Sequence, residues 1–326
     1  MASSISASIS YVIAFIFSGR LNRITPICPS TAYSKSAMRT LPIPVAPQYP
    51  CRQRRARGTV RPAVRGGRLR SMPIRTERRD RTLLITLDRP AAMNSIDPEM
   101  YQQLGETWDE FEHDEALLVA VVTGAGEKAF CSGRDLVKSA QDVSNDWSQQ
   151  RGGGRLTPEG IWKPVIAAIN GHCLAAGLAL ALGCDLRVAS PNATFGTMAA
   201  KRGIVAGGGQ TQRLARYIPF GIAMEMILFA ERMSAEDALR HGLVNRVVPQ
   251  DQLLPFALGW AERLCENGPL AVQAMKRAAY EGGWDMNFRE GMRLEARLYA
   301  EIMKTEDAAE GGRAFAEKRP ARFKGR

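Results

Sequence analysis

Hydrophobic and polar positions follow two alternating patterns after the first seventy or so residues of the chain. Residues 81–90 (RTLLITLDRP) and 117–126 (LLVAVVTGAG) contain continuous apolar runs of strand length, which are typical of buried strands. Between them, residues 97–114 carry apolar side chains three or four positions apart, with Asp97 at the N-cap and Pro98 at the first helical position. This spacing predicts an amphipathic helix flanked by two strands.

The same alternation continues through the middle of the chain. Residues 164–173 (PVIAAINGHC) predict another buried strand, which runs directly into a helix over residues 174–183 (LAAGLALALG). Residues 185–190 and 245–248 are further short strand-like segments. Because strands alternate with helices, the pattern predicts an α/β fold.

From about residue 221 the pattern is almost wholly helical. The polar, glycine-containing stretch from Val137 to Gly160 predicts a mobile loop beside a pocket. The predicted helices cover residues 221–230, a segment that begins Ser234-Ala235-Glu236-Asp237 and resembles a capping box, and residues 252–266, 269–281 and 285–304.

Charge is distributed very unevenly along the chain. The 326 residues have a net charge of +11, with 44 basic and 33 acidic side chains. Residues 1–76 contain thirteen of the basic residues and no acid, so the remainder has 31 basic against 33 acidic residues, a net charge of −2. The basicity therefore belongs to a leader, which argues against a body that binds nucleic acid.

The leader, residues 1–71, is rich in Ser and Arg and poor in acids, as organelle transit peptides are. An equally favoured alternative is a start codon placed too early, since an ordinary domain begins at Met72; a secretory signal is less favoured than either. Its apolar run, residues 11–17, is far shorter than the roughly 20 residues of a membrane span. We expect a cytoplasmic protein if the start is misplaced, and a mitochondrial or plastid protein otherwise.

Cysteine and histidine spacing indicates neither disulfides nor a metal. The six cysteines include no Cys-x-x-Cys pair, and those of the body lie in apolar surroundings, which favours reduced, structural thiols. The three histidines, His113, His172 and His241, are scattered without ligand spacing. We therefore expect no metal site.

Two strand-to-helix turns carry the candidate chemistry, residues 129–136 (AFCSGRDL) and 169–180 (INGHCLAAGLAL). Small residues at such a turn leave backbone N–H groups free and pointing outward. Two such donors can hold a developing oxyanion, although small residues at either turn can also serve tight packing alone.

With five further motifs in the same order, these turns resemble the crotonase, or enoyl-CoA hydratase/isomerase, superfamily over residues 72–326. The resemblance implies an α/β fold with a crotonase-type ββα-spiral core, expected over residues 72–262. It also implies a C-terminal helical region, residues 263–326, that builds homotrimers or hexamers. The further motifs are ITLDRPAAMNSID, KPVIAAINGHCLAAGLALALGCDLRVAS, FG…G…GGGQTQRL, AEDALRHGLVNRVVP and FAEKRPARFK.

The resemblance implies an acyl-CoA ligand, with coenzyme A as part of the substrate and no separate cofactor. The thioester carbonyl is expected to accept the backbone N–H groups of Cys131 and of Ala176, which replaces the middle glycine of the family's Gly-Gly-Gly. The adenine end is expected near Ala91, Ala92 and Met93. Further contacts with CoA or substrate are expected from Ser132, Gly133 and Asp135, and from Phe315 and Lys318, which match an aromatic-plus-lysine pair that reaches a neighbouring subunit's CoA. The alternative for that last pair is an ordinary amphipathic terminal helix.

The acids that the family uses for hydration are missing. The two glutamate positions fall on Ala179 and Ala199, and a third acidic position falls on Gly207. Because a methyl group cannot move a proton, ordinary two-glutamate hydration is not supported. Other residues could take part, and most of them have a simpler interpretation. His172 could act as a base or be a packed residue, and Asp135 could act as an acid or cap a helix. Lys201 and Arg202 could bind a carboxylate of the substrate or be a solvated pair, while Glu159 and Asp142 could be carried into the site by the loop.

We therefore expect an enzyme of the lyase or isomerase type that stabilises an enolate-like intermediate of an acyl-CoA through an oxyanion hole. The alternative is a non-catalytic family member that binds CoA thioesters or acts as a scaffold. An RNA-binding relative is a third hypothesis, and the near-neutral body argues against it. The expected partners are the acyl-CoA and further copies of the chain, without nucleic acid or membrane.

Overall fold

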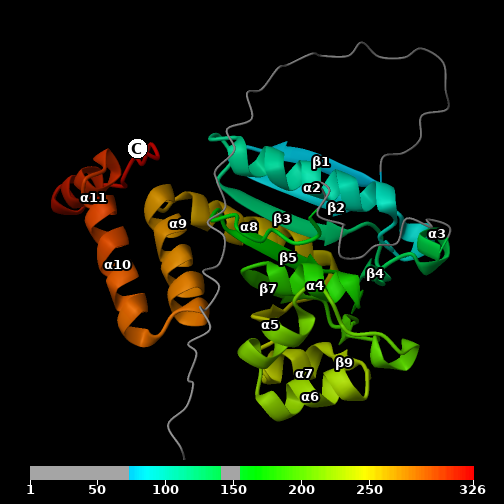
Figure 1. Cartoon of the computed structure of the whole chain (residues 1–326). Coiled ribbons are helices and arrows are strands. Elements are labelled where there is room, and N and C mark those ends of the chain that lie inside the picture. Colours follow the sequence, from blue (N-terminus) through cyan, green and yellow to red (C-terminus); the bar gives the residue numbers. More distant parts are fainter. Residues whose placement is uncertain (1–72, 141–154) are drawn as a thin grey trace, which may run out of the picture. The chain divides into compact units, whose positions relative to one another are not determined.

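A six-stranded sheet and a four-stranded sheet form the centre of the fold (Figure 1). The computed structural model describes residues 73–140 and 155–326, which lie within the unit Gly67–Arg326. The larger sheet has the order β1 (Ile74–Arg79), β2 (Thr82–Leu87), β3 (Val119–Gly124), β5 (Val165–Ile169), β7 (Leu186–Ala189) and β10 (Arg246–Val247).

Strands β2, β3 and β5 are buried along their whole length, which explains their continuous apolar runs. They pair in parallel with one another, while β1 pairs antiparallel to β2 at the edge. The strands expected near residues 81–90, 117–126, 185–190 and 245–248 are confirmed. Strand β1 was not predicted, because every residue of it after Ile74 is exposed.

The smaller sheet contains β4 (Ala129–Cys131), β6 (His172–Leu174), β8 (Thr194–Gly196) and β9 (Met233–Ser234). Successive strand pairs β3–β4, β5–β6 and β7–β8 each place one strand in each sheet, and helices follow them. This repeated ββα unit is the predicted spiral core.

The single strand predicted over residues 164–173 was wrong, because the chain there changes sheets between β5 and β6. The change occurs at Asn170-Gly171. A Cβ on Gly171 would lie 2.3 Å from the carbonyl oxygen of Lys128, so only glycine fits at this crossing. The crossing brings the end of β6 beside β4.

Helices cover both faces of the larger sheet. Helix α2 (Pro98–His113) begins as predicted, because the Asp97 side chain accepts the N–H of Met100 at 2.9 Å. Its apolar side packs into the main core, whereas α8 (Leu253–Cys265) packs into a second cluster on the opposite face. The remaining elements before α8 are η1 (Pro90–Ala92), α3 (Leu136–Ala140), α4 (Ala176–Gly183), η2 (Ala200–Arg202), α5 (Gln210–Tyr217), α6 (Phe220–Leu228), α7 (Ala235–Arg240) and η3 (Gln250–Gln252).

The helices predicted over 174–183, 221–230 and after Ser234 are confirmed, and Ser234 caps α7 by accepting the N–H of Asp237. Of the loop predicted from Val137 to Gly160, residues 137–140 belong to α3 and residues 141–154 lie outside the described residues.

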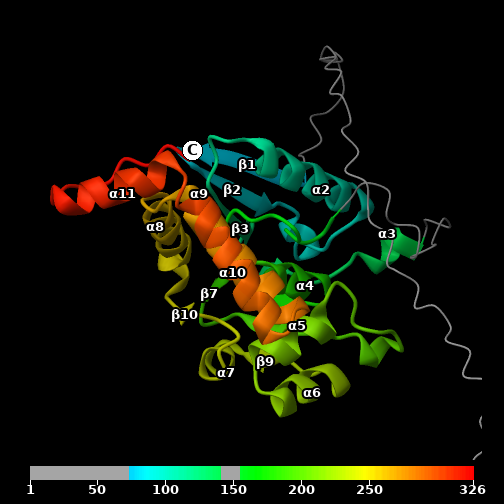
Figure 2. The same cartoon turned by 60° about the vertical axis from the view of Figure 1, so that its left-hand side comes forward.

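Four helical segments follow α8: α9 (Pro269–Arg277), the π-helix η4 (Ala278–Asp285), α10 (Phe288–Ile302) and α11 (Glu306–Ala316). The helix predicted over 269–281 therefore continues to residue 285, and its last part is a π-helix. Helix α10 returns alongside α9 and η4 (Figure 2), with Gly282 and Gly291 at the close approach. Lys276 anchors α9 to the core through a 2.7 Å ion pair with Asp185.

Two further features concern only the described parts of the chain. No helix there is long and apolar enough to cross a membrane. Those parts also contain no group of three or more His, Cys, Asp or Glu side chains placed to hold a metal ion.

We predict that Gly171→Ala lowers the free energy of unfolding by about 3 kcal/mol, because its methyl group would overlap the Lys128 backbone at the sheet crossing. Urea unfolding measures the change. The matched control is Gly312→Ala in α11, where an added Cβ meets nothing within 4 Å, and there we expect stabilisation by about 0.5–1 kcal/mol. Equal effects of the two substitutions would contradict this account of Gly171.

Candidate functional site

The two strand-to-helix turns lie directly against each other. A Cβ on Gly133 would lie 2.9 Å from the Cβ of Ala175 and 3.7 Å from the backbone nitrogen of Ala176. A Cβ on Gly177 would lie 2.3 Å from the carbonyl oxygen of Cys131. The end of β4 and the start of α4 are therefore in backbone contact, which requires glycine at both positions.

The two residues expected to supply backbone donors, Cys131 and Ala176, lie at these turns. Ala176 is the first residue of α4, and the N–H groups of a first helical turn have no acceptor within the helix. Cys131 is the last residue of β4, where the pairing with β6 shifts in register. Burial raises the pKa of its thiol to about 12, so the side chain is neutral at pH 7. The Cys131 side chain therefore adds no charge beside its backbone N–H group.

Backbone strain falls on Ala175, next to the expected donor. Ala175 has φ 48° and ψ −115°, a region that L-residues other than glycine rarely adopt. Its N–H donates to the Gly196 carbonyl at 2.8 Å, which ties the turn to β8. The positive φ belongs to Ala175 and not to Ala176, so an alanine at the donor position itself meets no such strain.

Two methyl groups and one glycine occupy the positions where the resemblance led us to expect acids. Ala179 is 1% exposed and Ala199 is 7% exposed. A Cβ on Gly208 would lie only 2.8 Å from the Ala179 methyl, so the glycine-rich run packs against α4. A Cβ on Gly207 would meet open space. This wall is apolar and closely packed at Ala179.

The residues expected near adenine lie beside the first turn. The Met93 carbonyl accepts the Ser132 N–H at 3.0 Å, and the Gly133 carbonyl accepts the Ile96 N–H at 2.8 Å. These bonds bring η1, with Ala91 and Ala92, next to Ser132 and Gly133.

Asp135 makes the contacts of a helix cap. Its carboxylate accepts the N–H of Lys138 in α3 at 3.2 Å and pairs with Arg89 at 3.0 Å. The Lys138 N–H and the Arg89 guanidinium lower the pKa of this carboxyl. Arg89 also pairs with Asp97 at 3.4 Å, so one cation joins the start of α2 to the start of α3.

Asn94 was missed by the sequence reasoning. It is fully buried, has φ 53°, and donates to the carbonyls of Ala125 and Ala129 at 3.0 and 2.7 Å, while its oxygen accepts the Arg89 N–H at 3.0 Å. Its place after the tight turn Pro90–Met93 is the one available signal, since Asn tolerates a left-handed backbone.

Gln210 was missed as well. It is 4% exposed at the first position of α5, and its amide donates to the Gly207 carbonyl at 2.8 Å. Its side-chain oxygen is buried and has no hydrogen-bond partner among the described residues. Such a group costs about 1–3 kcal/mol, and nothing in the sequence distinguishes it.

The proposed proton-transfer residues are engaged elsewhere. The ring Nδ1 of His172 lies 2.8 Å from the Thr194 hydroxyl, and burial with nearby Arg232 lowers its pKa. His172 begins β6, whereas the turn at Ala175 follows the end of that strand. The Glu159 carboxylate is 77% exposed and lies 3.7 Å from Arg213.

Lys201 and Arg202 are exposed on η2, and Arg202 donates to the Met198 carbonyl at 3.0 Å. Asp142 lies outside the described residues.

Phe315 and Lys318 are far from the two turns within the same chain. Figures 1 and 2 both place α11 well apart from α3 and α4. Phe315 is 89% exposed at the end of α11. Within one chain the structure therefore does not bring this pair to the two strand-to-helix turns.

Comparison with known proteins agrees with this architecture. The family model for enoyl-CoA hydratase/isomerase matches residues 77–326, and the chain belongs to this family. It is 44% identical over 256 residues to (E)-benzylidenesuccinyl-CoA hydratase from Thauera aromatica, covering 78% of this chain and 100% of that protein. It is 40% identical over 254 residues to carnitinyl-CoA dehydratase from Proteus mirabilis, covering 76% and 97%. The crystal structure of an enoyl-CoA hydratase from Mycobacterium marinum matches with a TM-score of 0.74 and 39% identity, over 78% of this chain and 100% of that one.

We predict that Ala175→Gly raises the free energy of unfolding by about 0.5–1 kcal/mol, because glycine adopts this φ without steric cost. Thermal unfolding checks the shift. Ala181→Gly, buried within α4, is the control and should destabilise by about 1 kcal/mol or more. Destabilisation by both substitutions would show that the backbone at Ala175 is unstrained.

Proposed function

We propose that this protein is an enzyme that acts on an acyl-CoA thioester, and that the N–H groups of Cys131 and Ala176 hold the thioester oxygen while an enolate-like intermediate forms. The observation that supports the proposal is the close approach of the two turns: a Cβ on Gly177 would lie 2.3 Å from the Cys131 carbonyl oxygen, and a Cβ on Gly133 would lie 3.7 Å from the Ala176 nitrogen.

The physical basis is the charge that develops on the thioester oxygen when the α-carbon gains electron density. Two fixed N–H donors stabilise that charge without reorganisation, and loss of one such donor typically costs ~10²–10³ in rate. The N-terminus of α4 adds a favourable dipole. Backbone donors do not depend on side-chain identity, so alanine at position 176 is compatible with the role.

The two relatives are named as a hydratase and a dehydratase of CoA thioesters. Ala179 and Ala199 supply no proton-transfer group here, so we propose that the base comes from another residue or from the substrate. Isomerisation, decarboxylation, hydrolysis of a C–C bond and slow hydration are each compatible with oxyanion stabilisation alone.

We also propose that copies of the chain associate through α10 into a trimer, alone or paired as a hexamer. Three large apolar side chains on this helix and one at its C-cap are exposed, and their spacing of 0, 4, 11 and 15 positions places them on one face. A second copy of the same chain is the occupant that this face and the family both favour. The four residues are Phe288, Met292, Tyr299 and Met303.

We predict that the protein turns over at least one member of a panel of enoyl-, β-keto- and malonyl-type CoA esters, measured in a steady-state assay. Gly177→Ala should lower kcat/KM by ~10²–10³, because its methyl group would push the Cys131 backbone away from α4. Full activity of Gly177→Ala would contradict the oxyanion assignment. Tight binding of CoA esters without turnover would instead identify a non-catalytic CoA-thioester-binding protein.

We predict that crotonyl-CoA hydration is at least ~10⁴-fold slower than in a two-glutamate hydratase, since each general acid or base contributes about 10²–10⁴-fold. The rate of loss of the enoyl absorbance measures it. Rapid hydration that His172→Ala or Glu159→Ala abolishes would show that the base has moved to that residue, and that the alanines do not mark a lost activity.

A further inference from the structure

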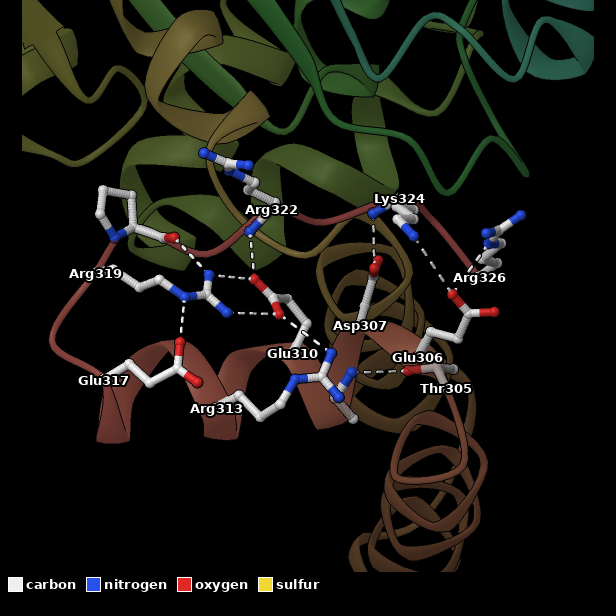
Figure 3. A network of polar contacts seen from close by, with 12 residues as sticks. Thr305, Glu306, Asp307, Glu310, Arg313, Glu317, Arg319, Arg322, Lys324 and Arg326 are labelled. Carbon is white, nitrogen blue, oxygen red and sulfur yellow. Dashed lines mark hydrogen bonds and ion pairs between the residues drawn. The ribbon is translucent and has the colours of Figure 1, made fainter.

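The chain after α11 is strongly basic and folds back along that helix (Figure 3). Five cations follow Glu317, the last acidic residue of the chain: Lys318, Arg319, Arg322, Lys324 and Arg326. Although this segment has no helix or strand, carboxylates of α11 hold it at several points.

Glu310 is the first of these carboxylates. It accepts two hydrogen bonds from the Arg319 guanidinium, at 2.6 and 3.0 Å, and the backbone N–H of Arg322 at 3.0 Å. Arg319, followed by the Arg322 N–H, lowers the pKa of Glu310 to about 2. The pairing is therefore present above the ordinary glutamate pKa of 4.5, and it is lost only as the pH falls towards 2.

Asp307 is the second, one helical turn earlier. Its two oxygens accept the N–H groups of Lys324 at 2.7 Å and Gly325 at 2.8 Å, and its own N–H donates to the Arg326 carbonyl at 3.1 Å. The residue is 6% exposed. We call Asp307, Glu310 and residues 319–325 the C-terminal clasp.

The clasp closes a corner at the end of α11. The N–H of Arg319 bonds the Ala314 carbonyl at 3.1 Å, and that of Lys318 bonds the Phe315 carbonyl at 3.3 Å, which is the Schellman pattern. Lys318 has φ 52°, a left-handed conformation that is unfavourable for residues other than glycine. Such a residue persists where surrounding contacts fix it, and the clasp supplies those contacts.

The two side chains at this corner are free of the rest of the described chain. The Phe315 ring is 89% exposed, and the Lys318 ammonium has no hydrogen bond or ion pair with any described residue. An exposed aromatic face beside an unpaired cation suits a ligand that carries a base and a phosphate.

We propose that the C-terminal clasp is a positioning device, which holds Phe315 and Lys318 in one arrangement for the nucleotide end of a CoA ester bound to a second copy of the chain. The proposal rests on the proposed function. Asp307 and Glu310 are positioning residues, because they act through the corner and do not contact the ligand. Opening the clasp therefore weakens recognition of the nucleotide and leaves the reaction at the thioester unchanged.

Glu310→Gln and Asp307→Asn test the proposal, with kcat and KM measured for an acyl-CoA and for the same acyl group on pantetheine, which lacks the nucleotide. We expect KM for the CoA ester to rise about tenfold, the equivalent of one lost contact to a charged group. The kcat values and the KM for the pantetheine ester should not change. Glu236→Gln, which breaks an exposed 2.8 Å pair with Arg240, is the matched control and should change nothing.

Arg319→Lys keeps the charge and removes the two-bond contact with Glu310, so it should raise the same KM in a protein that still folds. Equal losses for both thioesters, or unchanged KM for both, would overturn the positioning role while leaving the proposed function intact. Wild-type protein that binds neither thioester would overturn the proposed function, and the positioning role with it.

Discussion

Close approach of two backbone segments is the constraint on which the rest of this structure depends. Gly177 at the start of α4 lies so near the Cys131 carbonyl that no side chain fits between them, and Gly171 crosses the Lys128 backbone in the same way. Each glycine sits where a β5–β6 unit meets the β3–β4 unit before it. These contacts set the spacing of the two sheets, and that spacing brings the turns at Cys131 and Ala176 against each other.

The larger sheet could be predicted because its buried strands are apolar on both faces. Helix α2 could be predicted because its N-cap residue and its helical spacing of apolar side chains indicate the same helix. The smaller sheet could not. Its strands have two or three residues each, too few to show a period, and β5 and β6 form one apolar run whose change of sheet depends on contacts with Lys128. Strand β1 is exposed along an edge, so its polar residues resemble a loop.

The residues of the candidate site could likewise be predicted only in part. Positions 131 and 176 were identified through a family resemblance, since small residues at one turn do not show that another turn faces them. Asn94 and Gln210 were missed because their importance lies in burial and in partners far along the chain. The positive φ of Ala175 could not be foreseen either, because neighbouring residues impose that conformation on an ordinary alanine.

The contact between Ala179 and Gly208 makes these two positions epistatic. The methyl group of one occupies the space that a side chain on the other would need, so a larger residue at either position is tolerated only while the other stays small. Effects of substitutions at the pair are then non-additive. A side chain larger than alanine at position 179 therefore requires that position 208 remain glycine, so the order in which the two positions change decides whether the fold tolerates the pair.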